Sequence, residues 1–94
     1  MSGTGAIRRT VVITNPRGLH PRAVLVFLKT CKQFKATITV WRGEKQADGR
    51  SMWDLIGLAA EPGTELVLEL DGDDAAAAVG PLGELLESPG SDDE

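Results

Sequence analysis

The segment NPRGLHPRAVLVFLKTC, residues 15–31, joins a predicted strand to a predicted helix and contains the only histidine of the chain, His20. Residues 15–18 form a turn cluster that ends the strand. Pro21 fits the first position of a helix, where its missing N–H needs no partner. We therefore place His20 at the N-cap of a helix over residues 21–33. Its core-facing stripe has the spacing i, i+3, i+4, i+7 and comprises Val24, Phe27, Leu28 and Cys31.

Outward from this segment, the hydropathy pattern alternates between strand and helix periods. The predicted strands cover residues 8–14, 36–42, 44–47 and 64–70, and a short helix starting at Ser51 and a final helix over 74–86 complete the set. Asp54, three residues after Ser51, resembles a capping box. The order β-α-β-β-α-β-α predicts an open-faced β-sandwich of the α/β (α+β) class, with a four-stranded antiparallel sheet and three helices on one face.

Length and composition bound the class of protein. With 94 residues, of which 41% are hydrophobic, the chain predicts a single domain over residues 1–86 and a disordered acidic tail over 87–94. It contains neither an apolar run of membrane-spanning length nor a secretory signal. We expect a cytoplasmic monomer that does not insert into membranes.

The short helix after Ser51 carries two apolar faces. Leu55, Leu58 and Ala59 fall on one face, which simple periodicity assigns to the core. A second set, comprising Met52, Trp53 and Ile56, predicts an exposed apolar patch of the kind that binds partner proteins. The alternative is that Trp53 tucks under a loop.

His20 has the setting of an anion site. A side chain at a helix N-cap faces backbone N–H groups without intrahelical partners and the positive end of the helix dipole. Arg22 supplies a guanidinium that can bind two phosphate oxygens, and Arg17 is a further candidate contact. This setting suits a phosphoryl group carried on a ring nitrogen. The alternative is a histidine that only caps the helix or occupies the turn.

Charge is divided unevenly along the chain. Residues 1–50 hold all ten Lys and Arg against two acids, whereas residues 51–94 hold twelve acids and no Lys or Arg. We interpret the basic half as a patch around His20 that meets acidic protein partners. A small nucleic-acid-binding domain is the alternative, but no aromatic residues interleave with the basic ones, and we expect no nucleic-acid partner. Cys31 is predicted to be a core thiol, and one His with one Cys gives too few ligands for zinc. We expect neither a metal nor a cofactor.

Three motifs together resemble a known family. They are NPRGLHPRA at 15–23, GRSMWDLIGLAA at 49–60 and EPGTEL at 61–66, and the likeness extends over about residues 7–86. The chain resembles HPr, the histidine-containing phosphocarrier of the phosphoenolpyruvate-dependent sugar phosphotransferase system. The resemblance implies phosphorylation of His20 on Nδ1, phosphate contact by Arg22, regulatory phosphorylation of Ser51, and docking of partner enzymes on Met52, Trp53 and Ile56.

The resemblance also implies partners and a role. A phosphocarrier of this family is a stoichiometric phosphoryl carrier rather than an enzyme: enzyme I would donate to His20, and sugar-specific acceptor proteins would receive the phosphoryl group. HPr serine kinase/phosphorylase would act on Ser51. A regulatory version of the same module, signalling carbon or nitrogen status without sugar transport, is the alternative. The chain departs from the family pattern at Ala23, where proline is common, and at Pro21 and Arg17.

Overall fold

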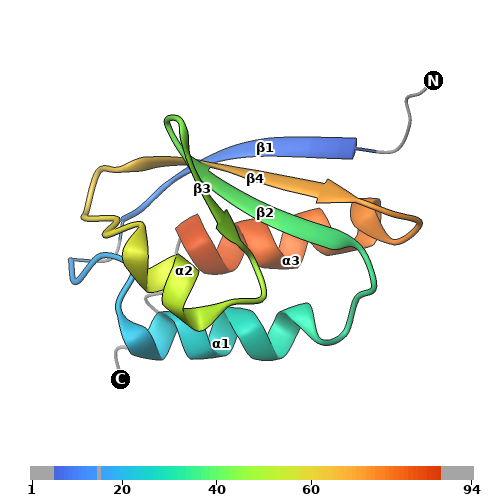
Figure 1. The fold of residues 1–94 in the computed structure, drawn as a ribbon, viewed down its shortest axis with the longest axis horizontal. Helices are drawn as coiled ribbons and strands as arrows, with labels where there is room; N and C mark the ends of the chain where they lie inside the picture. The colour runs from blue at the N-terminus through green and yellow to red at the C-terminus, as the bar shows by residue number, and fades with distance from the viewer. Residues whose placement is uncertain (1–5, 15, 88–94) are drawn as a thin grey trace.

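The computed structural model describes residues 6–14 and 16–87, and its elements follow the predicted order (Figure 1). They are β1 (Ala6–Val12), α1 (Pro21–Cys31), β2 (Thr37–Arg42), β3 (Lys45–Asp48), α2 (Met52–Gly57), β4 (Glu65–Asp71) and α3 (Ala75–Glu87).

The four strands form one antiparallel sheet in the order β1-β4-β2-β3. β4 is central because it pairs with β1 on one side and with β2 on the other. Leu68 shows this arrangement, since it lies opposite Arg9 of β1 and Val40 of β2. The alternating leucines of β4 face inward and are fully buried, whereas Glu69 lies on the outer face and accepts a hydrogen bond from Trp41 Nε1 at 2.8 Å.

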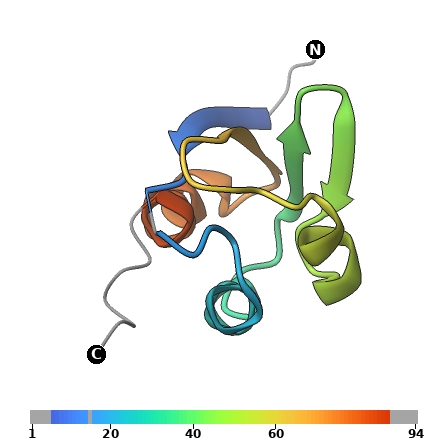
Figure 2. The same cartoon turned by 90° about the vertical axis from the view of Figure 1, so that its left-hand side faces the viewer.

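All three helices cover the same face of the sheet (Figures 1 and 2). α3 packs under β1 and β4, α2 packs beside β3, and α1 contacts both of the other helices. This arrangement confirms the predicted open-faced sandwich with a four-stranded antiparallel sheet. No helix within the described residues is long and apolar enough to cross a membrane.

The core lies between the helices and the inner face of the sheet. Val24, Phe27 and Cys31 of α1 are buried there as predicted, whereas Leu28 is only partly buried. α2 contributes Leu55, and burial of such a side chain stabilises the fold by about 1.5–3 kcal/mol. A six-residue helix is too short to be stable alone, so packing holds α2 in place.

The boundaries of three predicted elements are corrected, and the first of these, β1, covers Ala6–Val12 rather than residues 8–14. α1 ends at Cys31 rather than at Gln33, because the chain tightens into i→i−3 hydrogen bonds, including Gln33 N–H to the Thr30 carbonyl at 3.0 Å. We expected the tail to begin at Glu87, but Glu87 is the last residue of α3 and forms an ion pair with Arg9 at 3.1 Å. The remaining residues of the predicted tail, 88–94, lie outside the described residues.

Candidate functional site

His20 is the N-cap of α1, as the turn cluster and Pro21 predict. Its backbone is extended, with φ −89° and ψ 170°, and its carbonyl accepts the N–H of Val24 at 3.0 Å. The His20 side chain makes no capping hydrogen bond to the helix. The residue is half-buried at the start of an eleven-residue helix.

The turn before His20 is attached to the segment that follows α2. Leu19 is buried and donates its N–H to the Ala60 carbonyl at 2.9 Å. Gly18 has φ +70°, and a Cβ at this position would overlap the same carbonyl oxygen. Glycine is thus required by both conformation and space. The backbone that carries His20 is fixed from two sides, by α1 and by the segment after α2.

Arg17 and Arg22 are exposed residues that flank His20 in the chain. The first turn of α1 contains no acidic residue, and its N–H groups face the end of the helix without intrahelical partners. The dipole of an eleven-residue helix adds positive potential at the same end. The arrangement favours a negatively charged group at His20.

Ser51 caps α2, as predicted, and its Oγ accepts the N–H of Asp54 at 3.2 Å. The second hydrogen bond of a capping box, from the Ser51 N–H to the Asp54 carboxylate, is replaced by other contacts. The Asp54 carboxylate accepts the N–H of Asp48 at 3.1 Å, and Ser51 N–H instead donates to the Asp48 carbonyl at 3.0 Å. Asp54 therefore fastens α2 to the end of β3.

The predicted apolar patch on α2 is reduced to one strongly exposed residue. Trp53 is 81% exposed, which excludes the alternative that it tucks under a loop. Met52 and Ile56 are half-buried because they pack against the edge of the core. Ala59, which periodicity assigned to the core, is exposed, because the helix has already ended at Gly57 and the chain turns with φ +53° at this residue.

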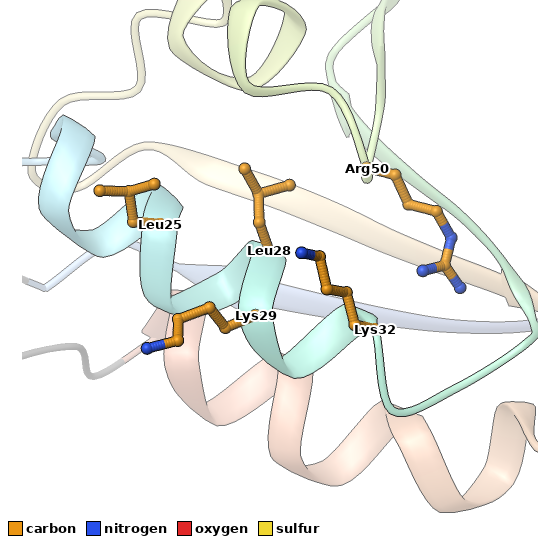
Figure 3. A pocket seen from close by; sticks show the side chains of 5 residues that line it. All are labelled: Leu25, Leu28, Lys29, Lys32 and Arg50. Carbon is orange, nitrogen blue, oxygen red and sulfur yellow. The ribbon is translucent and has the colours of Figure 1, made fainter.

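A groove between α1 and the start of α2 was not predicted from the sequence. It has a volume of about 310 Å³ and is lined by Leu25, Leu28, Lys29, Lys32 and Arg50 (Figure 3). Leu25 is 51% exposed, so the lining combines accessible apolar surface with basic side chains. Figure 3 shows the Lys32 side chain running toward Leu28, while the guanidinium of Arg50 turns toward the end of α1.

Three basic residues of the β2–α2 region serve as helix caps, a role that their local sequence does not signal. Arg50 donates to the carbonyls of Cys31, Phe34 and Ala36 at 2.8, 2.6 and 2.9 Å, and so joins the end of α1 to the start of β2. Arg42 and Lys45 donate to carbonyls at the end of α2. From the sequence we assign these charges to a surface patch. The carbonyls that they bind are 12 to 19 residues away in the chain, so local patterns do not reveal these contacts.

Cys31 is a buried free thiol, and its Sγ lies 3.7 Å from the Gly49 carbonyl oxygen. Burial raises the pKa of this thiol to about 11, although the positive charge of Arg50 opposes the rise. The neutral thiol is the form that the core accommodates. Across residues 6–14 and 16–87, no group of three or more His, Cys, Asp or Glu side chains is placed to hold a metal ion.

Comparison with known proteins gives the class. Residues 7–88 match the family model described as PTS HPr component phosphorylation site. The phosphocarrier protein HPr of Neisseria meningitidis serogroup B is 38% identical over 80 residues, covering 85% of this chain and 90% of that protein. The phosphocarrier protein HPr of Haemophilus influenzae is 39% identical over 71 residues, covering 76% and 84%.

Solved structures of HPr proteins have a similar fold. An HPr from Thermoanaerobacter tengcongensis superposes with a TM-score of 0.81 at 30% identity, covering 87% of this chain and 92% of that one. An HPr from Bacillus anthracis superposes with a TM-score of 0.83 at 22% identity, covering 88% and 99%, and supports the fold alone. The fold and the sequence likeness together define a small phosphocarrier of the phosphotransferase system. The chain belongs to the HPr family.

Proposed function

We propose that this protein accepts a phosphoryl group from phospho-enzyme I on His20 and passes it to sugar-specific acceptor proteins. The observation that carries this proposal is the position of His20 at the N-cap of α1, where the N–H groups of the first turn face the end of the helix and no acidic residue lies in that turn. Family membership supports the same assignment, since the matched residues 7–88 include the whole segment.

In the proposed reaction the ring nitrogen of His20, Nδ1 by family resemblance, attacks the phosphorus atom of the donor phosphohistidine. A new P–N bond forms as the donor P–N bond breaks, and the electron pair of the broken bond returns to the donor imidazole. The phosphoryl oxygens would lie near the first-turn N–H groups of α1, with Arg22 as the expected bidentate contact and Arg17 as a second one. Transfer to an acceptor repeats the exchange, so the protein is consumed and regenerated rather than acting as an enzyme.

Ser51 is the proposed regulatory site, modified by HPr serine kinase/phosphorylase. Its hydroxyl caps α2, so a phosphate there would gain the N–H groups of the first turn while adding about two negative charges beside Asp54. These charges would stand next to Arg50, at the edge of the basic groove. We expect phosphorylation to weaken the docking of an acidic partner without unfolding the domain.

The docking surface combines Trp53 with the groove between α1 and α2. Exposed Trp and Leu side chains supply apolar contact, and Lys29 and Lys32 supply charge that attracts an acidic surface. Loss of one cation in the groove should slow association with enzyme I, whereas loss of a cation on the open face of the sheet should not. Lys32→Ala and Arg8→Ala form the matched pair, because each removes one basic side chain.

The central experiment is incubation with phosphoenolpyruvate and enzyme I, followed by intact mass measurement before and after mild acid. An acid-labile phosphate that is absent from His20→Ala is the expected result, and phosphate that persists in that variant would overturn the assignment. Arg22→Gln should still be phosphorylated but more slowly, because it removes a phosphate contact and keeps the acceptor.

Two further measurements separate the parts of the proposal. Transfer from the phosphorylated protein to a sugar-specific acceptor distinguishes a carrier from a purely regulatory module, and failure with every acceptor of the cell would favour the latter. Incubation with ATP and the serine kinase should give acid-stable phosphate that is lost in Ser51→Ala. If the wild-type protein incorporates none, Ser51 is not a regulatory site.

A further inference from the structure

The last carbonyls of α2 are bound by cations from the β2–β3 hairpin. Arg42 Nη1 donates to the Leu58 carbonyl at 2.7 Å and to the Ala59 carbonyl at 3.3 Å, and Lys45 Nζ donates to the Gly57 carbonyl at 2.7 Å. α2 has no basic residue in its own last turn. The negative end of this short helix is therefore neutralised from a separate element.

Arg42 binds the two peptide groups on either side of the Ala59 Cα. Those peptide planes together define the backbone conformation of Ala59, which is left-handed with φ +53°. A residue with a Cβ disfavours this conformation and keeps it only where the surroundings impose it. The guanidinium of Arg42 is one such constraint, because a single nitrogen, Nη1, donates to the carbonyls of both planes.

The next carbonyl along the chain belongs to the site. Ala60 O accepts the Leu19 N–H at 2.9 Å, and the missing Cβ of Gly18 leaves room for this oxygen. Leu19 is bonded directly to His20, whose own carbonyl begins α1. The left-handed turn at Ala59 thus aims the Ala60 carbonyl at the backbone that carries the imidazole.

We propose that Arg42 is a positioning residue for His20. It fixes the turn at Ala59, the turn places the Ala60 carbonyl, and that carbonyl holds Leu19 and the start of α1. The positioning of the backbone at Leu19 and His20 is argued from the hydrogen bonds of Arg42 and of the Ala60 carbonyl. The effect of this positioning on phosphoryl transfer rests on the proposed function. A residue on the β2–β3 hairpin, distant in sequence from the histidine, then limits how well the phosphoryl acceptor is aligned.

Amide hydrogen exchange tests the placement. In Arg42→Met the Leu19 N–H should exchange about ten-fold faster relative to the Leu68 N–H, which lies in the central strand and reports global unfolding. Arg42→Lys keeps a donor and should restore part of the protection. Lys45→Met is the matched control, because it removes one bond to the same helix end without touching the planes that flank Ala59.

The outcomes are distinct. If Leu19 and Leu68 accelerate together, Arg42 only stabilises the whole domain and the positioning role is wrong. If Lys45→Met loosens Leu19 as much as Arg42→Met does, helix capping in general is responsible and the specific role of Arg42 is overturned.

Kinetics with enzyme I test the effect on transfer. Arg42→Met should lower the maximal rate of phosphorylation on the order of ten-fold, since small misplacements of a reacting group are costly. The KM should stay within about two-fold, because the docking groove is formed by other residues. An unchanged maximal rate beside a loosened Leu19 would overturn the kinetic claim. If the wild-type protein is not phosphorylated at all, the proposed function fails and the exchange result still decides the placement.

Discussion

Gly18 lies against Ala60 so closely that a Cβ on Gly18 would overlap the Ala60 carbonyl oxygen. The same oxygen accepts the N–H of Leu19 at 2.9 Å, so the close approach and the hydrogen bond depend on each other. Gly18 also has φ +70°, a conformation that L side chains rarely adopt. The turn before His20 and the segment after α2 can approach this closely only because residue 18 has no side chain.

Gly18→Ala should therefore lower the free energy of unfolding by about 2–3 kcal/mol, combining the cost of the left-handed conformation with displacement of the loop. Urea unfolding measures this change. Gly43→Ala is the matched control, because Gly43 has φ +61° but has no other atoms within 4 Å of the position of an added Cβ. It should cost about 1 kcal/mol, and equal losses in the two variants would show that the contact with Ala60 contributes nothing.

Arg50→Met should lower the free energy of unfolding by about 2–3 kcal/mol, because three carbonyls between the end of α1 and the start of β2 lose a charged donor. Thermal and urea unfolding both measure the effect. Arg8→Met is the control: its guanidinium is 3.5 Å from Glu69 on an exposed surface and should contribute less than about 0.5 kcal/mol. Equal effects of the two substitutions would mean that the Arg50 bonds are no stronger than an exposed ion pair.

Ala59→Gly should raise the free energy of unfolding by about 1 kcal/mol, because glycine adopts the left-handed conformation of this residue without a steric penalty. The side chain of Ala59 is exposed, so its loss removes little packing. Ala77→Gly, at an exposed position in α3, should have the opposite sign, since glycine weakens a helix interior. A destabilised Ala59→Gly would indicate that the entropy of the unfolded chain outweighs the relief of strain.

Local patterns predicted every element of the sheet and helices to within two residues. The alternating leucines of β4 and the proline after His20 are signals within a few residues of the structure they specify. The N-cap positions of His20 and Ser51 were predictable for the same reason, because a cap is a local contact.

Many of the contacts that the sequence does not predict join residues that are distant in the chain. The guanidinium groups of Arg42 and Arg50 bind carbonyls 14 to 19 residues away, and only the assembled fold brings them to the ends of α2 and α1. Periodicity assigned Ala59 to the core because it cannot detect a helix that ends early. The groove beside Lys32 is also not predicted from the sequence, because its lining combines residues of α1 with Arg50, which are distant in the chain.

Cys31 predicts a specific loss of stability at high pH. Burial raises the pKa of its thiol from 9.0 to about 11, so the folded state holds the proton more tightly than the unfolded state does. The contribution of the neutral thiol is fully present below the unfolded pKa and is lost as the pH rises through the folded pKa. At about 1.4 kcal/mol for each unit of difference, the whole loss approaches about 3 kcal/mol, and about 2 kcal/mol of it should fall between pH 9 and pH 11.

The measurement is the free energy of urea unfolding of wild type and Cys31→Ala at several pH values across this window. Lysines and other groups titrate in both proteins, so their contributions cancel in the difference, and the cavity that alanine leaves adds only an offset that does not change with pH. The stability of the wild-type protein should fall toward that of Cys31→Ala as the pH rises, because only the wild type has a buried thiol to deprotonate. Two curves that stay parallel to pH 11 would mean that the folded and unfolded states bind this proton equally, contrary to the burial of Sγ beside the Gly49 carbonyl.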